Sequence, residues 1–165
     1  NLEVINNSLK DSTRVSSMVL IIVAASTAFS QVLAFSGASR GLTNFAVNLP
    51  FGSFWILIGM LAVVFFLGMF IEQISIMMVT LPIFMPIVHE LGFNPIWVGI
   101  LMLMVLQIAL LTPPVGLLLY TIKGVTPDDI TMKDIWAAAM PYVIAGLAAI
   151  GILLAFPSIT TVLVG

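Results

Sequence analysis

The sequence predicts an all-α membrane protein that combines transmembrane helices with a re-entrant helical hairpin and a proline-broken helix. Its composition gives the first reason: 61% of the 165 residues are hydrophobic and 7% are charged, whereas a soluble domain has about 25% charged residues. The second is that charge-free runs each exceed the roughly 20 residues that cross a bilayer as a helix. These runs are 15–39, 41–71, 91–122 and 135–165. The third is that closely spaced prolines interrupt two of the apolar segments.

The same composition excludes several classes of function. The net charge is −2 and no basic stripe is present, so nucleic acid is not an expected partner. Cysteine is absent and there is one histidine, which leaves neither thiolate chemistry nor a histidine-based metal cluster. No Walker motif, nucleotide fingerprint or nucleophile elbow occurs, so we expect no organic cofactor and no ATP hydrolysis.

The first part of the chain divides into a polar segment and two apolar ones. Residues 1–14 are predicted to form an interfacial or connector helix, and residues 15–67 to form scaffold-type transmembrane helices. Pro50 is a predicted helix start, ahead of the apolar segment 51–70 with Trp55 as a headgroup-level anchor. Asn1 is not Met, and we expect the sequence to be a piece of a longer polypeptide.

Residues 68–123 are predicted to hold the mobile, transport-type elements. The apolar stretch 74–88 contains Pro82 and Pro86, which remove two backbone donors four residues apart. Such a segment is tolerated at membrane depth where it is buried in protein or lines a cavity. We therefore expect it to be one arm of a re-entrant hairpin, closed at the interface by residues 89–95.

The most informative motif is Thr112-Pro113-Pro114-Val115-Gly116, which falls inside the apolar run 96–122. Consecutive prolines followed by glycine cannot continue an α-helix, so we expect two half-helices joined by extended chain. Interrupted helices in transporters use their freed carbonyls to coordinate cations. The break, with the hydroxyl of Thr112, is accordingly a candidate Na⁺ site. The competing interpretation is a simple proline kink packed against its neighbours.

Residues 124–165 are predicted to be a connector followed by the last transmembrane helix. Thr126-Pro127-Asp128-Asp129 has the residue order of a helix start, with a threonine cap, proline in the first turn and acids after it. The last span is predicted at 135–156, ended by Pro157. Basic residues on both sides of the spans leave the membrane orientation undetermined.

Other polar residues have a structural and a functional interpretation. Glu72 lies at the mouth of the predicted hairpin, where it is either a functional acid or a cap of the hairpin backbone. His89 and Glu90 close a segment at the interface, although an intramembrane enzyme could use them as acid and base. The hydroxyls and amide of residues 26–31 are expected to bond to backbone carbonyls or across a helix interface.

Several of these motifs together resemble one known family. They are Gly68-Met-Phe-Ile-Glu72, Leu81-Pro-Ile-Phe-Met-Pro-Ile87, Leu91-Gly-Phe-Asn-Pro-Ile-Trp-Val-Gly-Ile100, Leu111-Thr-Pro-Pro-Val-Gly116 and Ala139-Met-Pro-Tyr142. The sequence resembles the C-terminal part of the large membrane (M) subunit of tripartite ATP-independent periplasmic (TRAP) transporters. The resemblance covers essentially residues 8–157.

The resemblance implies an elevator-type secondary transporter made of inverted repeats, of which this chain holds one half. It implies multi-pass insertion in the bacterial inner membrane and Na⁺-coupled uptake of small organic acids such as C4-dicarboxylates or sialic acid. A periplasmic substrate-binding protein and a small membrane (Q) subunit would be its partners.

The resemblance also implies particular binding residues. Na⁺ would be held around Gly68, Ala109, Thr112 and Val115, with Thr80 and Pro82, near the hairpin tip, as weaker candidates for another ion. Substrate would lie near Pro113, Pro114 and Gly116. The family usually has glycine three residues before the motif's threonine, where this sequence has Ala109, so the ion pocket would be narrower here.

Three rival functions remain open at this point. One is a related ion-coupled carboxylate or metal-oxyanion carrier that needs no binding protein. The others are an intramembrane enzyme using His89 and Glu90, and a passive assembly subunit. The acid carried, the number of Na⁺ ions and the oligomeric state are not determined by the sequence.

Overall fold

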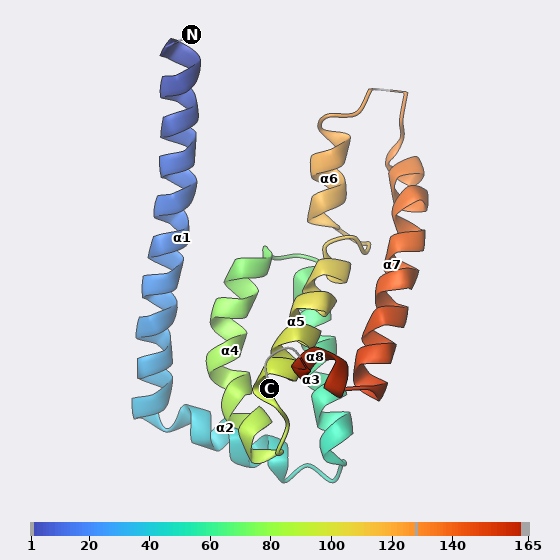
Figure 1. The fold of residues 1–165 in the computed structure, drawn as a ribbon. Coiled ribbons are helices and arrows are strands. Elements are labelled where there is room, and N and C mark those ends of the chain that lie inside the picture. Colours follow the sequence, from blue (N-terminus) through green and yellow to red (C-terminus); the bar gives the residue numbers. More distant parts are fainter. Residues whose placement is uncertain (1, 128, 163–165) are drawn as a thin grey trace.

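The protein is described by a computed structural model that covers residues 2–127 and 129–162. About 80% of the chain is helical, and the described residues contain no strand. The helices follow one another as α1 Leu2–Ser36, α2 Ala38–Val47, α3 Ser53–Gly68, α4 Gln73–Glu90, α5 Pro95–Ala109, α6 Leu117–Lys123, α7 Met132–Ala155 and α8 Ser158–Thr161 (Figure 1). Within the described part, three helices are long and apolar enough to cross a membrane, namely α1, α4 and α7. The prediction of an all-α membrane protein is confirmed.

The first helix does not divide where the polarity of the sequence changes. Residues 1–14 were expected to form a separate connector helix, but from Leu2 on they are the first turns of α1, which runs for 35 residues without a break. No glycine or proline occurs between Leu2 and Ser36, so nothing in the backbone ends the helix at the polarity change. The chain turns only at Gly37, whose φ of 73° is the left-handed conformation that glycine adopts readily.

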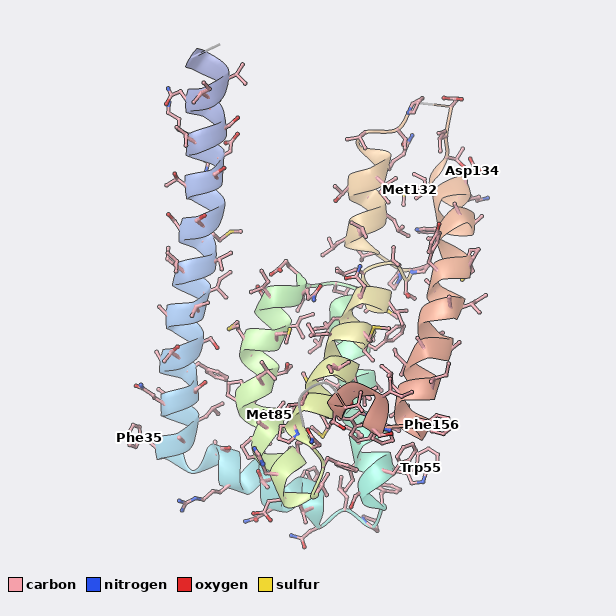
Figure 2. The ribbon with its side chains drawn as sticks, viewed as in Figure 1. Phe35, Trp55, Met85, Met132, Asp134 and Phe156 are labelled. Atoms are coloured by element: carbon pink, nitrogen blue, oxygen red, sulfur yellow. The ribbon has the colours of Figure 1, made fainter. Side chains whose placement is uncertain are left out.

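The helix α3 is shorter than the expected 51–70 segment. Pro50 does not begin it: the residue lies in the preceding turn, and the helix starts at Ser53 after an extended Gly52. Trp55 is two-thirds exposed and projects from the outer surface (Figure 2), as a headgroup-level anchor requires. The turn Met69–Glu72 then reverses the chain into α4.

The helix α4 is continuous over 18 residues although Pro82 and Pro86 lie inside it. The expected interruption of this segment is therefore wrong. Pro82 leaves the carbonyl of Met78 without its usual helical donor. That carbonyl instead accepts a hydrogen bond from the hydroxyl of Ser26 on α1. A neighbouring helix thus supplies the hydrogen-bond donor that the Met78 carbonyl lacks.

The core is organised around α5, which packs against α3, α4, α7 and α8. Leu101, Met102, Leu106 and Ala109 of this helix are completely buried. Near its start, the indole N–H of Trp97 donates to the carbonyl of Leu153 on α7 at 2.8 Å. This bond ties the first turn of α5 to the last turns of α7.

The helix α7 begins later than the proline-containing motif predicted. Thr126 and Pro127 are not helical, and Asp128 lies outside the described residues. The helix starts instead at Thr131, whose hydroxyl and backbone N–H form a reciprocal capping box with Asp134. The sequence offers two possible N-terminal caps, Thr126 and Thr131, and the one closer to the apolar run forms the cap. The helix then continues through Pro141 to Ala155.

Candidate functional site

The break at the Thr-Pro-Pro-Val-Gly motif is present in the structure. Helix α5 ends at Ala109 and α6 begins at Leu117. Between them the chain forms turns rather than the extended link that the sequence suggested, and the Pro113–Pro114 peptide bond is cis. Gly116 has a φ of 58°, and a β-carbon there would lie 3.2 Å from Leu119. Glycine is thus needed both for the backbone conformation and for the space.

The break leaves several backbone carbonyls without donors. The carbonyls of residues 110, 111, 114 and 115 accept no hydrogen bond from the described residues, whereas the carbonyl of Ala109 accepts one from the N–H of Thr112 at 3.1 Å. The hydroxyl of Thr112 donates to the carbonyl of Ile108 at 2.8 Å, so its oxygen lone pairs stay available as acceptors. The arrangement offers neutral oxygens, which are the ligands of hard cations.

The last residue of α3 packs against the last turn of α5, directly before the break. Gly68, the last residue of α3, is buried against α5. A β-carbon built on it would lie 2.7 Å from the β-carbon of Ala109 and 3.3 Å from a methyl group of Leu106. Any side chain at position 68 would therefore push the two elements apart. Figure 1 shows the α3–α4 connection at the level where α5 ends.

The structure thus brings some of the predicted site residues together. Gly68 meets Ala109, and Thr112 meets Gly116, since the Thr112 carbonyl lies 3.4 Å from the β-carbon position of Gly116. Val115 and Pro113 are half-buried in the same segment, and Pro114 is exposed.

The two weaker ion candidates lie elsewhere. Thr80 is buried within α4, where its hydroxyl donates to the carbonyl of Ile76 at 2.8 Å. It follows the start of α4 at Gln73 by seven residues, or about 10 Å of helix. Thr80 and Pro82 therefore lie inside α4, away from the turn Met69–Glu72, and their role in holding another ion stays a prediction.

The polar residues with two interpretations are now placed. Glu72 caps α4, accepting hydrogen bonds from the backbone N–H groups of Ile74 at 2.7 Å and Ser75 at 3.0 Å. His89 and Glu90 are exposed at the far end of the same helix. In α1, Thr27 and Ser30 bond to carbonyls of their own helix and Ser26 to α4, as the structural interpretation predicts.

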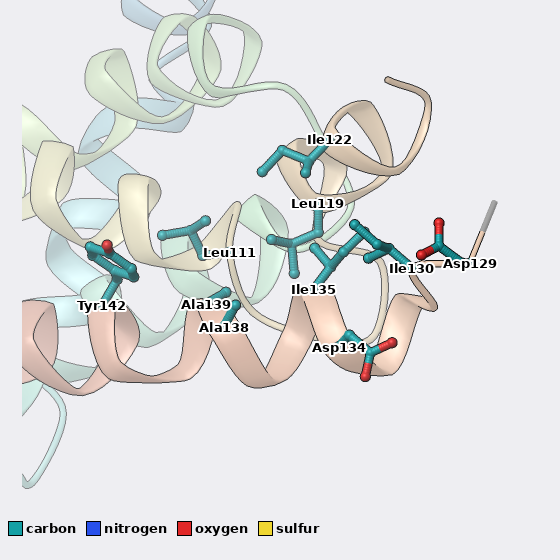
Figure 3. Close-up of a pocket in the computed structure, with 10 residues that line it drawn as sticks. All are labelled: Leu111, Leu119, Ile122, Asp129, Ile130, Asp134, Ile135, Ala138, Ala139 and Tyr142. Atoms are coloured by element: carbon teal, nitrogen blue, oxygen red, sulfur yellow. The ribbon is translucent and has the colours of Figure 1, made fainter. Parts of the chain in front are cut away.

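A cavity lies beside the break, but its lining does not suit an organic acid. It has a volume of about 660 Å³ and lies between α6 and α7, with Leu111 at one end (Figure 3). Its lining is apolar apart from Asp129 and Asp134 near the outer end and Tyr142 near the other. The two carboxylates would repel an anionic substrate.

Sequence reasoning missed two parts of this site. One is Leu106, which contacts Gly68 and reads as ordinary core from its apolar side chain. The other is the carbonyl of Leu110, which lies four residues before Pro114 and so loses its helical donor. The spacing of four residues between Leu110 and Pro114 indicates this loss from the sequence alone.

The protein is apolar and helical, and its central helix is broken close to the connection between two other helices. Interrupted helices of this kind are typical of membrane transport proteins. A family model describing the tripartite ATP-independent periplasmic transporter, DctM component, matches residues 1–159. The chain belongs to this family, which confirms the resemblance seen in the sequence.

Curated relatives agree with this assignment. The chain is 31% identical to the C4-dicarboxylate TRAP transporter large permease protein DctM of Pseudomonas aeruginosa, and 31% identical to the protein of the same name from Rhodobacter capsulatus. It is 24% identical to the sialic acid TRAP transporter large permease protein SiaM of Vibrio cholerae. Each alignment covers 94% of this chain and 35–36% of the relative. The chain therefore spans about a third of the length of these relatives, and the match is to permeases, not to enzymes.

Proposed function

We propose that the chain is part of a Na⁺-coupled permease that moves small organic acids across the bacterial inner membrane. The observation that carries this proposal is the set of donor-free carbonyls in the break, which begins directly after Ala109, the residue that Gly68 packs against. The relatives named above are permeases for a C4-dicarboxylate and for sialic acid, which supports carboxylates as the substrate class.

In this proposal Na⁺ binds between the break and the α3–α4 turn. Carbonyl oxygens of the break and the hydroxyl of Thr112 supply ligands, and Val115 lies in the same loop. Because Gly68 lets the turn approach Ala109 without a side chain between them, the ion would be enclosed from both sides. Thr80 and Pro82 remain weaker candidates for a second ion, held farther along α4.

The organic acid would bind beside the ion at Pro113, Pro114 and Gly116. A cation held close to a carboxylate binds it far more strongly in a site shielded from water than in bulk solvent. Coupling then follows, because substrate affinity would depend on the ion being present. The rest of the site would come from parts of the longer protein outside this chain.

The short apolar helices support a re-entrant arrangement. Helix α3 has 16 residues and α5 has 15, which correspond to about 24 and 22 Å of helix and fall short of a hydrocarbon core of about 30 Å. We propose that α3 and α4 form a re-entrant hairpin whose tip, Met69–Glu72, lies near the break; this assigns α3 to the transport element, although the sequence led us to expect residues 15–67 in the scaffold. This unit would move as the transport element of an elevator-type, inverted-repeat permease.

The proposed partners are a periplasmic substrate-binding protein and a small membrane subunit. The test is uptake by the complete system in proteoliposomes, with a C4-dicarboxylate as substrate. Uptake is expected to require both an inward Na⁺ gradient and the binding protein. Uptake that proceeds without either one would overturn the proposal, and uptake that needs Na⁺ alone would favour a carrier that works without a binding protein.

A further inference from the structure

A polar cavity lies at the end of the molecule opposite the break. It has a volume of about 540 Å³ and is lined from α2 by Ser39, Arg40, Thr43 and Asn44, and from α4 by Pro86, His89 and Glu90. Helix α4 separates it from the α3–α4 turn, since its 18 residues span about 27 Å. The cavity is therefore distinct from the proposed ion site.

The two charged groups of this cavity lie at helix ends where the helix itself disfavours them. Arg40 is in the first turn of α2, and Glu90 is the last residue of α4. A helix is electropositive at its N-terminus and electronegative at its C-terminus, so it favours an acid at the first end and a base at the second. Helix stability therefore does not account for either residue.

The same placement gives the lining of the cavity two opposite charges. The guanidinium of Arg40 adds to the electropositive end of α2, and the carboxylate of Glu90 adds to the electronegative end of α4. Within the described residues, no ion pair of 4.0 Å or less joins Arg40 to Glu90. A cavity of this kind is complementary to a guest that carries one negative and one positive group.

The surroundings of the cavity are those of an amphiphile. Helix α2 runs across the ends of the other helices (Figure 1) and packs Thr43 and Ala46 inward. It leaves Leu42 and Phe45 exposed beside the polar cavity, and Phe35 projects outward at the adjoining end of α1 (Figure 2). Short amphipathic helices of this type lie at the boundary between headgroups and acyl chains.

We propose that this cavity binds the headgroup of a zwitterionic phospholipid with a primary ammonium, of the phosphatidylethanolamine type. Arg40, with Ser39 and Asn44, would hold the phosphate, and Glu90 would accept hydrogen bonds from the ammonium. A glycerol headgroup lacks the positive charge, and a choline headgroup lacks the N–H donors. His89 can hydrogen-bond either end of the headgroup. This site is independent of the proposed Na⁺ coupling.

The experiment uses the complete permease in nanodiscs that contain phosphatidylethanolamine, phosphatidylglycerol and phosphatidylcholine in equal amounts. Native mass spectrometry then measures the lipids retained by the protein. The wild type is expected to enrich phosphatidylethanolamine about tenfold over the other two, the magnitude of one charge-assisted hydrogen bond. Glu90→Gln should abolish that preference, and Arg40→Gln should lower retention of all three lipids.

Two exposed charges away from the cavity provide matched controls. Lys133→Gln changes the net charge as Arg40→Gln does, and Asp11→Asn changes it as Glu90→Gln does, but neither residue lines the cavity. Both should retain the wild-type preference. The proposal would be overturned if the wild-type protein showed no headgroup preference and both cavity variants had lower thermal stability. That result would mean that Arg40 and Glu90 only pair with each other. Displacement of the lipid by soluble phosphoethanolamine at equal concentration would overturn the assignment to a lipid in favour of a soluble ligand.

Discussion

Two regions of this molecule contain paired prolines, and they respond to them in opposite ways. Helix α4 passes through Pro82 and Pro86 without interruption, whereas the chain leaves the helix at Pro113 and Pro114. Both segments are apolar and both lose two backbone donors. The number of prolines therefore does not decide whether a membrane helix breaks.

The Met78 carbonyl, which Pro82 deprives of its helical donor, accepts the hydroxyl of Ser26 on α1 instead. The carbonyl of Leu110, four residues before Pro114, has no such donor among the described residues. A donor from another helix is not a general requirement, because α4 and α7 also continue through Pro86 and Pro141, where no such donor is found among the described residues. The break is distinguished by its two consecutive prolines and by Gly116, whose φ is positive.

The largest expected effect comes from closing the break. The double substitution Pro113→Ala with Pro114→Ala restores two N–H donors, so the carbonyls of Ala109 and Leu110 can regain helical partners. Na⁺-driven uptake should fall about 100-fold or more, which corresponds to about 2.7 kcal/mol of lost transition-state stabilisation. Uptake in proteoliposomes measures this. Pro86→Ala in α4 is the control and should stay within about twofold of wild type, because that helix is already continuous. Equal losses in both variants would contradict the distinction between the regions.

The approach of the turn to the break gives the next largest effect. Gly68→Ala places a β-carbon 2.7 Å from that of Ala109, and overpacking of this kind costs about 1–3 kcal/mol. Uptake should fall about tenfold, and adding Ala109→Gly should restore most of it. Gly59→Ala on the same helix is the matched control, because no atom lies within 4 Å of its β-carbon position. Failure of the double variant to recover would show that the contact does not matter for transport.

A smaller effect is expected from removing the donor that α1 supplies to α4. Ser26→Ala leaves the Met78 carbonyl unpaired, which should lower the free energy of unfolding by about 1–2 kcal/mol. Thermal unfolding of the complete permease in detergent checks this. In the background of Pro82→Ala the same substitution should cost much less, because residue 82 then supplies the N–H. Thr27→Ala, whose hydroxyl bonds within its own helix, should change stability by less than about 0.5 kcal/mol.

The smallest effect is expected from removing the hydrogen bond between the indole N–H of Trp97 and the carbonyl of Leu153. Trp97→Phe keeps an aromatic ring but removes the N–H that reaches the carbonyl of Leu153, at a cost of about 1 kcal/mol. Thermal unfolding should show this decrease. Unchanged unfolding in Trp97→Phe would indicate that this hydrogen bond does not stabilise the packing of α5 on α7.

The sequence predicted those features that depend on nearby residues. Thr112-Pro113-Pro114-Val115-Gly116 predicted a break because consecutive prolines and a glycine act on their own backbone, and the structure contains it. The donor to the Met78 carbonyl was missed because it comes from Ser26, which lies 52 residues before Met78 in the chain. The start of α7 was missed because Thr126 and Thr131 both precede acids at suitable spacing. The contact between Gly68 and Ala109 arises only when α3 packs on α5.

The central claim is that the break, and not the proline-containing helix, holds the coupling ion. Two threonines allow a direct test, since Thr112 and Thr80 each donate to the carbonyl four residues before at 2.8 Å. Thr112→Val and Thr80→Val each remove one oxygen at nearly constant shape. The measurement is the Na⁺ concentration that gives half-maximal uptake by the complete permease. The account predicts a rise of about fivefold or more for Thr112→Val, as for the loss of about 1 kcal/mol of binding, and less than about twofold for Thr80→Val. An unchanged Na⁺ dependence in Thr112→Val, or a larger change in Thr80→Val, would contradict it.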